Sequence, residues 1–174
     1  MKRPLVIEGP DGAGKSTPRD RLAEDLRRTP IHTGGPTRTR NDVLRRNQAM
    51  LGFDRSKVIF DRVSPISDTV YRQAEGRPIL VAFEEQLEFL KQFGVVIIYC
   101  RLGSSAEMVE HIDRSPKPHK PADYLEKVIA NHPRVVELYD ETMELVRQAG
   151  LPVLTFNWKQ DRYTDLVRAI ACVA

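Results

Sequence analysis

The hydrophobic residues of the chain fall into short apolar runs, separated by longer stretches in which apolar residues recur with helical spacing. This order is typical of βαβ units, in which helices cover both faces of a parallel sheet. We therefore predict an α/β fold with a five-stranded parallel sheet. The predicted strands are Pro4–Ile7, Ile31–Thr33, Lys57–Phe60, Val95–Cys100 and Pro152–Phe156.

Seven helices are predicted between and after these runs. In the longest one, apolar residues recur every three or four positions from Leu125 to Val146, so one helix face can pack on the sheet. Pro133 is expected to break or kink this helix after His132, because proline has no backbone N–H to donate. The predicted helices are Lys15–Arg28, Asn41–Leu51, Ser67–Glu75, Ile79–Phe93, Ala106–Ile112, Ala122–Ala149 and Asp161–Ala171.

Length and composition favour one compact domain. The chain has 174 residues, of which 41% are hydrophobic, and we expect a single domain over residues 1–174. The formal net charge of +3 is too small to indicate a nucleic-acid partner by itself. The most apolar run, Val95–Cys100, is far shorter than the roughly 20 residues of a membrane-spanning helix. We therefore expect a cytoplasmic protein without a membrane segment.

The segment Gly9–Ser16 fits the pattern G-x-x-x-x-G-K-[ST] and lies between the first predicted strand and the first predicted helix. Glycines in such a loop let several backbone N–H groups point at phosphate oxygens, and the helix N-terminus adds a partial positive charge. Lys15 is expected to reach the β- and γ-phosphates of ATP, and the Ser16 hydroxyl to bind Mg²⁺. The predicted ATP-binding residues of this loop are Gly12, Ala13, Gly14, Lys15, Ser16 and Thr17.

A second group of polar residues follows the third predicted strand. Asp61 and Arg62 come directly after it, and Ser67 and Tyr71 follow in the next helix. Ligands of parallel α/β sheets gather at the carboxyl ends of the strands, so this pair should emerge beside the phosphate loop. A carboxylate there can hold Mg²⁺ or its waters, and an arginine can bind a second phosphate with two hydrogen bonds.

Taken together, the segments Glu8–Thr17, Thr33–Pro36 and Asp61–Arg62, with Ser67 and Tyr71, resemble the thymidylate kinase family of nucleoside monophosphate kinases. The likeness runs in order over most of the chain. It implies the three-layer P-loop kinase fold with a short lid, and transfer of the ATP γ-phosphoryl group to a deoxynucleoside monophosphate such as dTMP. Dimers are common in this family, so a homodimer is among the expectations.

The resemblance also implies roles for individual residues. Asp11 would contact the acceptor sugar, Arg62 would bind the acceptor phosphate, and Asp61 would work with magnesium. Some members of the family carry a catalytic arginine within the phosphate loop, at the position of Gly12 here. A lid over residues 113–122 would then supply the charge, with Arg114 as the expected catalytic residue and Lys117 and Lys120 as further candidates.

The chain departs from the family between Pro36 and Lys57, where only 20 residues replace a longer helical stretch that lines the base pocket. Such a compact form is typical of viruses and other small genomes, and it would also admit a modified deoxynucleotide as the acceptor. Candidates for the shortened pocket are Phe53 or Tyr71 against the base and Arg45 or Arg46 on the phosphate. For ATP, the loop after the last strand brings Trp158 near the adenine.

Two other functional classes remain open. A kinase of the same fold can phosphorylate a nucleoside, another small hydroxyl compound or a hydroxyl on DNA, although the low net charge is less favourable for DNA. A non-enzymatic nucleotide-binding switch would need an effector segment, for which one kinase-like domain of 174 residues leaves little room.

Overall fold

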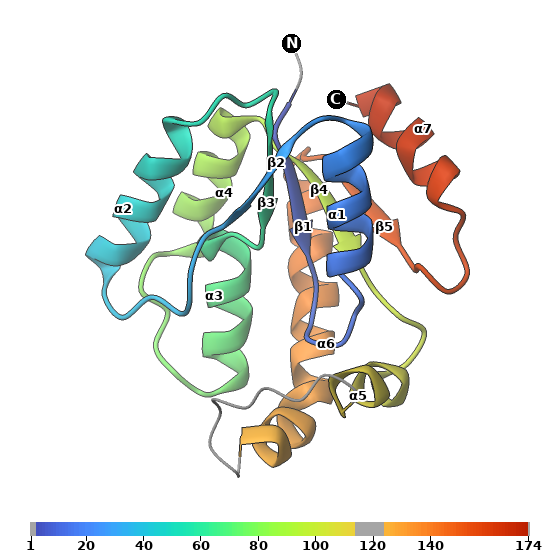
Figure 1. Cartoon of the computed structure of the whole chain (residues 1–174). Helices are drawn as coiled ribbons and strands as arrows, with labels where there is room; N and C mark the ends of the chain where they lie inside the picture. Colours follow the sequence, from blue (N-terminus) through green and yellow to red (C-terminus); the bar gives the residue numbers. More distant parts are fainter. Residues whose placement is uncertain (1–2, 114–123, 174) are drawn as a thin grey trace.

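The computed structural model describes residues 3–113 and 124–173 and contains one five-stranded sheet (Figure 1). Its strands are β1 (Leu5–Glu8), β2 (Thr29–His32), β3 (Val58–Asp61), β4 (Val96–Cys100) and β5 (Val153–Phe156). Their order across the sheet is β2-β3-β1-β4-β5, and all neighbouring strands are parallel. The predicted α/β fold with a five-stranded parallel sheet is therefore confirmed.

The burial of each strand follows from its place in the sheet. All five residues of β4 are buried, as are all four of β1, because helices cover both faces of the central strands. Strand β2 lies at the edge and is largely exposed, and it begins at Thr29, two residues before the predicted start. An edge strand tolerates Pro30, which has no N–H to give to a further neighbour.

Helices are found at all seven predicted places. The helix expected from Ile79 begins only at Phe83, whereas the one expected from Ser67 begins at Ser64, with Pro65 in its first turn, where a missing N–H costs nothing. The helices are α1 (Ser16–Asp25), α2 (Arg40–Leu51), α3 (Ser64–Ala74), α4 (Phe83–Phe93), α5 (Ser105–Asp113), α6 (Tyr124–Gln148) and α7 (Tyr163–Val173).

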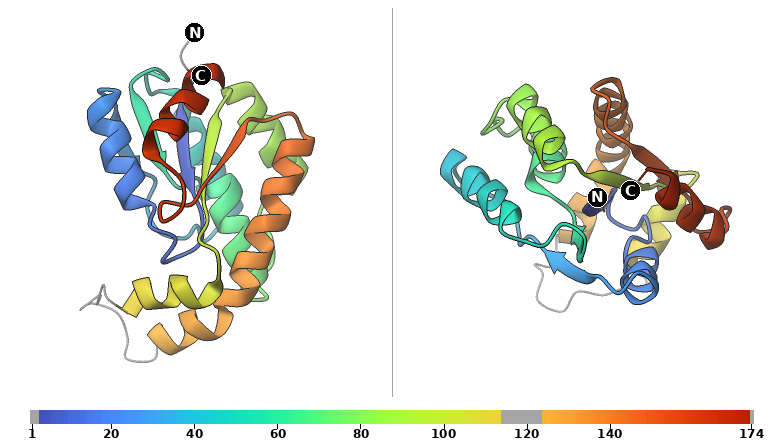
Figure 2. Two further views of the ribbon diagram at one scale, coloured as in Figure 1. Left: turned by 90° about the vertical axis from the view of Figure 1, so that its right-hand side faces the viewer. Right: turned by 90° about the horizontal axis from the view of Figure 1, so that it is seen from above.

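The helices form two layers with the sheet between them, as the side view in Figure 2 shows. Because successive side chains of a strand point to opposite faces, Val6 packs in the core with α3, α4 and α6. Leu5 and Ile7 pack in the other core, with Leu22 of α1 and Ile170 of α7. The arrangement is the three-layer architecture that the sequence predicts.

Helix α6 continues through Pro133 without a break. Its first turns run at an angle to the rest of the helix in Figure 2, which is the kink that proline produces by removing one backbone hydrogen bond. Of the two outcomes that the sequence allows, a break and a kink, the kink is therefore observed. It brings the N-terminal part of α6 below the carboxyl ends of the strands (Figure 1).

The carboxyl ends of the parallel strands meet at one edge of the sheet, where the loop after β1 and the residues after β3 lie. The predicted lid at 113–122 falls almost wholly outside the described residues, and so do its candidate cations Arg114, Lys117 and Lys120. In the described parts of the chain, no helix is both long and apolar enough to cross a membrane.

Candidate active site

The loop between β1 and α1 curls around the Lys15 ammonium group. Lys15 Nζ donates hydrogen bonds to the backbone carbonyl oxygens of Gly9 and Pro10, at 2.8 and 2.5 Å. Desolvation, together with the nearby Arg62 charge, lowers the pKa of Lys15 from 10.5 to about 8. Ser16 and Thr17 are exposed at the start of α1. This loop therefore has the glycines, lysine and hydroxyl of a phosphate-binding loop in the expected place.

Two glycines of the loop lie against other parts of the chain. A Cβ on Gly12 would lie 2.1 Å from the carbonyl oxygen of Met108 in α5, and a Cβ on Gly14 would lie 2.3 Å from Trp158 Nε1. Both glycines also have a positive φ, +76° and +73°, which other residues rarely adopt. Helix α5 and the loop after β5 thus cover the phosphate loop.

Trp158 lies against the phosphate loop at Gly14. Its ring also meets the edge of His111 in α5, with 5.1 Å between the ring centroids. The indole Nε1 is buried and has no hydrogen-bond partner among the described residues. A buried donor of this kind is normally satisfied, so the site has one donor left for a ligand atom or a water molecule.

Arg62, Asp11 and Tyr71 form one cluster beside the phosphate loop. Arg62 Nη2 donates to Asp11 Oδ1 at 2.9 Å, to Tyr71 Oη at 3.0 Å and to the Gly9 carbonyl oxygen at 3.3 Å. The Arg62 backbone has a φ of +66°, and its N–H donates to the carbonyl oxygen of Ile7 at 2.9 Å. Burial raises the pKa of the Tyr71 hydroxyl, so it stays neutral and can donate. The structure thus brings together three residues that the sequence assigns to the acceptor.

Glu8 is a further functional candidate. In the sequence it stands out only as the first residue of the segment Glu8–Thr17, which contains the phosphate loop. Its side chain is fully buried, accepting a hydrogen bond from the Val63 backbone N–H at 2.7 Å and another from Tyr139 Oη at 3.2 Å. Burial raises the pKa of Glu8 from 4.5 to about 7, although the Val63 N–H and the nearby Arg62 charge act in the opposite direction. Because Val63 follows Arg62, this carboxylate fixes the backbone that aims the Arg62 side chain.

Asp61 ends β3 beside the phosphate loop, as predicted. Its Oδ2 accepts a hydrogen bond from Arg19 Nη1 of α1, and His32 Nδ1 lies 3.6 Å from the same oxygen. Within residues 3–113 and 124–173, no three His, Cys, Asp or Glu side chains gather in a way that could hold a metal ion. Mg²⁺ in such sites is usually bound by substrate phosphates, water and few protein ligands, and the exposed Ser16 hydroxyl can be one of these ligands. The Asp61 carboxylate is instead hydrogen-bonded to Arg19.

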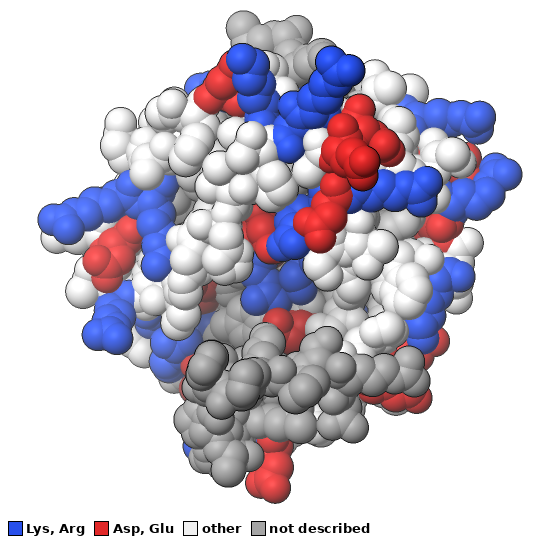
Figure 3. Space-filling model, viewed as in Figure 1, with Lys and Arg blue, Asp and Glu red and all other residues white. Residues whose placement is uncertain are grey.

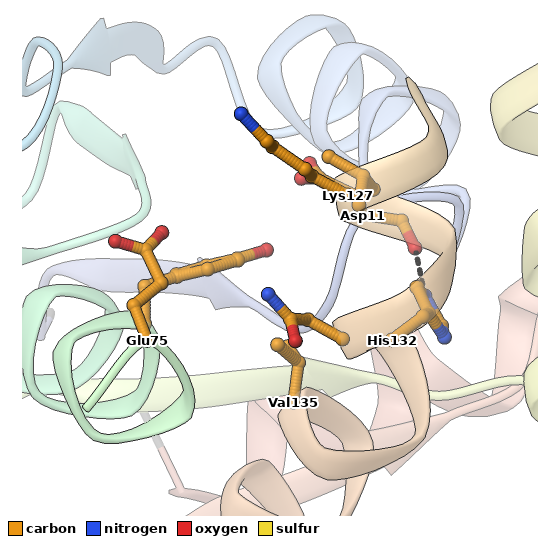
Figure 4. Close-up of a pocket in the computed structure, with 8 residues that line it drawn as sticks. Asp11, Glu75, Lys127, His132 and Val135 are labelled. Atoms are coloured by element: carbon orange, nitrogen blue, oxygen red, sulfur yellow. Dashed lines mark hydrogen bonds between the residues drawn. The ribbon is translucent and has the colours of Figure 1, made fainter. Parts of the chain in front are cut away.

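A cavity of about 310 Å³ opens next to the Arg62 cluster, between α3 and α6. In Figure 4, His132 points at the phosphate loop, where its Nε2 is 2.9 Å from the carbonyl oxygen of Asp11. Asp11 and Tyr71 both line the cavity, and most of the other lining residues come from α6, which the sequence does not assign to the site. The lining residues are Asp11, Tyr71, Glu75, Lys127, Val128, Asn131, His132 and Val135.

Of the two arginines considered for the acceptor phosphate, Arg46 is the one that contacts the segment following Arg62. Its Nη1 donates to the carbonyl oxygen of Gly35, in the loop after β2, and lies 3.4 Å from Ser64 Oγ. Arg45 is exposed on the outer side of α2. Likewise, Phe53 packs edge-on against Phe60, with ring centroids 5.8 Å apart, and is not part of the cavity wall.

Charged groups of both signs are interspersed on the face shown in Figure 3. Duplex DNA usually needs a contiguous basic surface, and the described residues on this face do not form one.

No family model matches the sequence, and no curated protein matches it. Solved structures do match. The Bacillus subtilis YorR protein in complex with phosphorylated GDP has a TM-score of 0.72 and 21% identity, over 97% of this chain and 93% of that one. Deoxyadenosine kinase from M. mycoides with bound dATP has a TM-score of 0.60 and 16% identity, over 95% and 97% of the two chains. The same kinase with bound dCTP has a TM-score of 0.58 and 16% identity, over 98% and 99%. The chain therefore shares its fold with these structures, among them a deoxyadenosine kinase.

Proposed function

We propose that the protein is an ATP-dependent nucleoside monophosphate kinase, similar to thymidylate kinases. It transfers the γ-phosphoryl group of ATP to dTMP or to a related deoxynucleotide, modified ones included. The observation that carries this proposal is the cluster of Arg62, Asp11 and Tyr71 between the phosphate loop and the cavity. Phosphoryl transfer requires two anionic groups held in line with their charge neutralised, and this cluster supplies a cation and sugar-binding groups at that point.

ATP is the donor in this proposal. The backbone N–H groups of the phosphate loop and Lys15 bind its phosphates, with Lys15 exchanging its present carbonyl partners for phosphate oxygens. Mg²⁺, held by Ser16 together with the phosphates and water, supplies charge neutralisation when it is bound. Trp158 borders the same loop and forms the wall on the ATP side. Arg114, from the sequence between the described segments, is the proposed lid cation.

The acceptor occupies the cavity between α3 and α6. Asp11 faces the acceptor sugar, and Arg62 binds its phosphate. Arg46 is better placed than Arg45 to contact the same phosphate, because it reaches Ser64, two residues after Arg62. Buried hydrogen-bonding groups of the cavity restrict the acceptor to molecules that satisfy them, since an unsatisfied polar group is costly.

A nucleoside acceptor is the second candidate. Arg62 is already neutralised by Asp11 and bonded to Tyr71 and Gly9, so a neutral acceptor would need no rearrangement of this cluster. The likeness to a deoxyadenosine kinase also supports this reading. Other small hydroxyl compounds, DNA ends and a non-enzymatic switch have no such observation in their favour.

The test is to incubate the purified protein with Mg-ATP and separate panels of nucleoside monophosphates, nucleosides and short DNA, and to separate the products by chromatography. A diphosphate formed from one or two deoxynucleotides supports the first proposal. A monophosphate formed from nucleosides, with no diphosphate, supports the second. Phosphorylated DNA alone, or no product with any acceptor, would reject both.

Two variants separate the donor and acceptor sides. Lys15→Ala should abolish transfer to every acceptor. Arg62→Ala should chiefly damage the use of monophosphates and leave slow ATP hydrolysis in water measurable. Equal loss of ATP hydrolysis in both variants contradicts this division between the two residues.

A further inference from the structure

Arg19 and Asp61 form an ion pair between α1 and the end of β3. Arg19 Nη1 donates to Asp61 Oδ2, and the two side chains are only 24% and 13% exposed. Sheltered pairs are screened by water and salt less than pairs on the open surface. The carboxylate that the sequence offers to a metal ion therefore already has a cationic partner.

Arg19 belongs to the same part of α1 as the phosphate-binding residues. Its backbone N–H donates to the Lys15 carbonyl oxygen at 3.1 Å, so it lies one helical turn after Lys15. Side chains of a helix lean toward its N-terminus, which here is the end at the phosphate loop. Arg19 thus extends along α1 toward the edge of the sheet at which Asp61 ends β3.

Arg19 is also held from a second side. Its Nε donates to Asp20 Oδ1 at 2.7 Å, so one guanidinium bridges two carboxylates. A divalent ion on the Asp61 carboxylate would face this guanidinium at close range, and the two cations would repel each other. Mg²⁺ is also satisfied by few protein ligands, because it keeps several waters and binds phosphates. Nothing in this geometry requires Asp61 to exchange Arg19 for a metal.

We propose that Arg19, and not a divalent ion, is the cation that neutralises Asp61 when nucleotide is bound. The inference rests on the proposed Mg-ATP site. The divalent ion is then held by Ser16, the phosphates and water alone. Asp61 is a positioning residue, which ties α1, and with it the start of the phosphate-binding helix, to β3.

The test measures how tightly Mn²⁺ binds to the complex of the protein with ADP, by electron paramagnetic resonance of the free ion. It compares the wild type with Asp61→Asn, Arg19→Met, Arg19→Lys and the double variant Arg19→Met/Asp61→Asn. Because the readout is metal affinity, phosphoryl transfer is not needed. Binding of ADP itself is followed by the emission of Trp158, the one tryptophan of the chain, which lies on the phosphate loop.

Asp61→Asn should leave the Mn²⁺ dissociation constant within about twofold of the wild type. Arg19→Met should bind Mn²⁺ roughly five- to tenfold more tightly, because it frees a carboxylate for the ion, and adding Asp61→Asn should cancel this gain. Arg19→Lys keeps the charge and should stay close to the wild type. An ion pair too far from the nucleotide to face the divalent ion would leave the Mn²⁺ dissociation constant unchanged in all four variants.

A loss of Mn²⁺ affinity of tenfold or more in Asp61→Asn overturns the inference, because Asp61 would then be a metal ligand. An unchanged affinity in Arg19→Met overturns it as well. If the wild type does not bind ADP, the proposed function fails, and this outcome is distinct from both. Thermal unfolding of each variant shows whether it is folded. If Arg19→Met does not fold, the Mn²⁺ affinities of the two single variants Arg19→Lys and Asp61→Asn decide whether Asp61 is a metal ligand.

Discussion

The indole ring of Trp158 lies so close to Gly14 that a Cβ at position 14 would approach its Nε1 to 2.3 Å. The loop after β5 and the phosphate loop are therefore in van der Waals contact without any room for a side chain. This contact makes both segments respond together to substitutions.

Gly14→Ala should weaken ATP binding at least tenfold and lower the melting temperature by several degrees. The added methyl group collides with Trp158, and the φ of +73° adds strain of about 1 to 2 kcal/mol for a residue with a Cβ. Calorimetric titration with ATP and thermal unfolding measure the two effects. Gly35→Ala is the matched control, because a Cβ there meets nothing within 4 Å.

Combining Gly14→Ala with Trp158→Ala should recover part of the lost stability, since the double variant removes the collision and keeps only the backbone strain. No recovery would mean that the contact with Trp158 is not what position 14 must avoid.

Glu8 should make the protein less stable as the pH rises from about 4.5 to 7. The folded state raises the pKa of Glu8 to about 7, so it holds a proton that the unfolded chain has already released in this range. The stabilisation that comes from binding this proton in the folded state is complete below pH 4.5 and is lost as the pH passes 7. It amounts to about 3 kcal/mol.

The measurement is the free energy of unfolding in urea at several pH values, for the wild type and for Glu8→Gln. The Gln variant cannot ionise, so the wild type minus the variant gives the contribution of this carboxyl group. A difference that does not decrease between pH 5 and 8 would contradict a raised pKa.

ATP affinity should fall roughly tenfold between pH 7.5 and 9. The pKa of Lys15 in the free protein is about 8, and only the protonated amine attracts phosphate, so binding weakens once the pH exceeds this value. Titration of Trp158 emission with ATP at each pH measures the affinity. Lys15→Arg keeps its charge over this range and should lose the pH dependence, whatever its absolute affinity.

Arg46→Ala should raise the KM for the acceptor by about tenfold, and Arg45→Ala by less than twofold. Arg46 reaches Gly35 and Ser64 at the acceptor side, whereas Arg45 points to solvent. Losing one charge-assisted hydrogen bond to a phosphate costs an effect of this size. Steady-state kinetics with the acceptor found in the panel decides between the two, and a larger effect of Arg45→Ala would place the acceptor elsewhere.

The sheet and its helices could be predicted because burial dictates the residue pattern. An unbroken apolar run such as Val95–Cys100 has few alternatives to a strand covered on both faces. Strand β2 was predicted two residues late, because an exposed edge strand with Pro30 carries almost no apolar signal.

Part of the site could also be predicted, because several of its residues follow closely in the sequence after the ends of β1 and β3. The carboxyl ends of parallel strands meet at one edge of the sheet, so these residues come together there. They are Asp11, Lys15, Arg62 and Tyr71. The partners of Asp61 could not, because whether Arg19 turns toward that carboxylate depends on the side-chain geometry of α1. That part of α6 lines the cavity could not be predicted from the sequence either. Its position depends on a kink at Pro133, which the sequence allows but does not orient.

The contact between Gly12 and the carbonyl oxygen of Met108 sets a condition on how this protein can change. Any side chain at position 12 requires a backbone shift, of α5 or of the phosphate loop, because the obstacle is a carbonyl group and not a movable side chain. An arginine at position 12 and the present positions of both backbones are thus mutually exclusive. A residue larger than glycine at position 12 therefore has to be accompanied by a shift of α5 or of the phosphate loop itself.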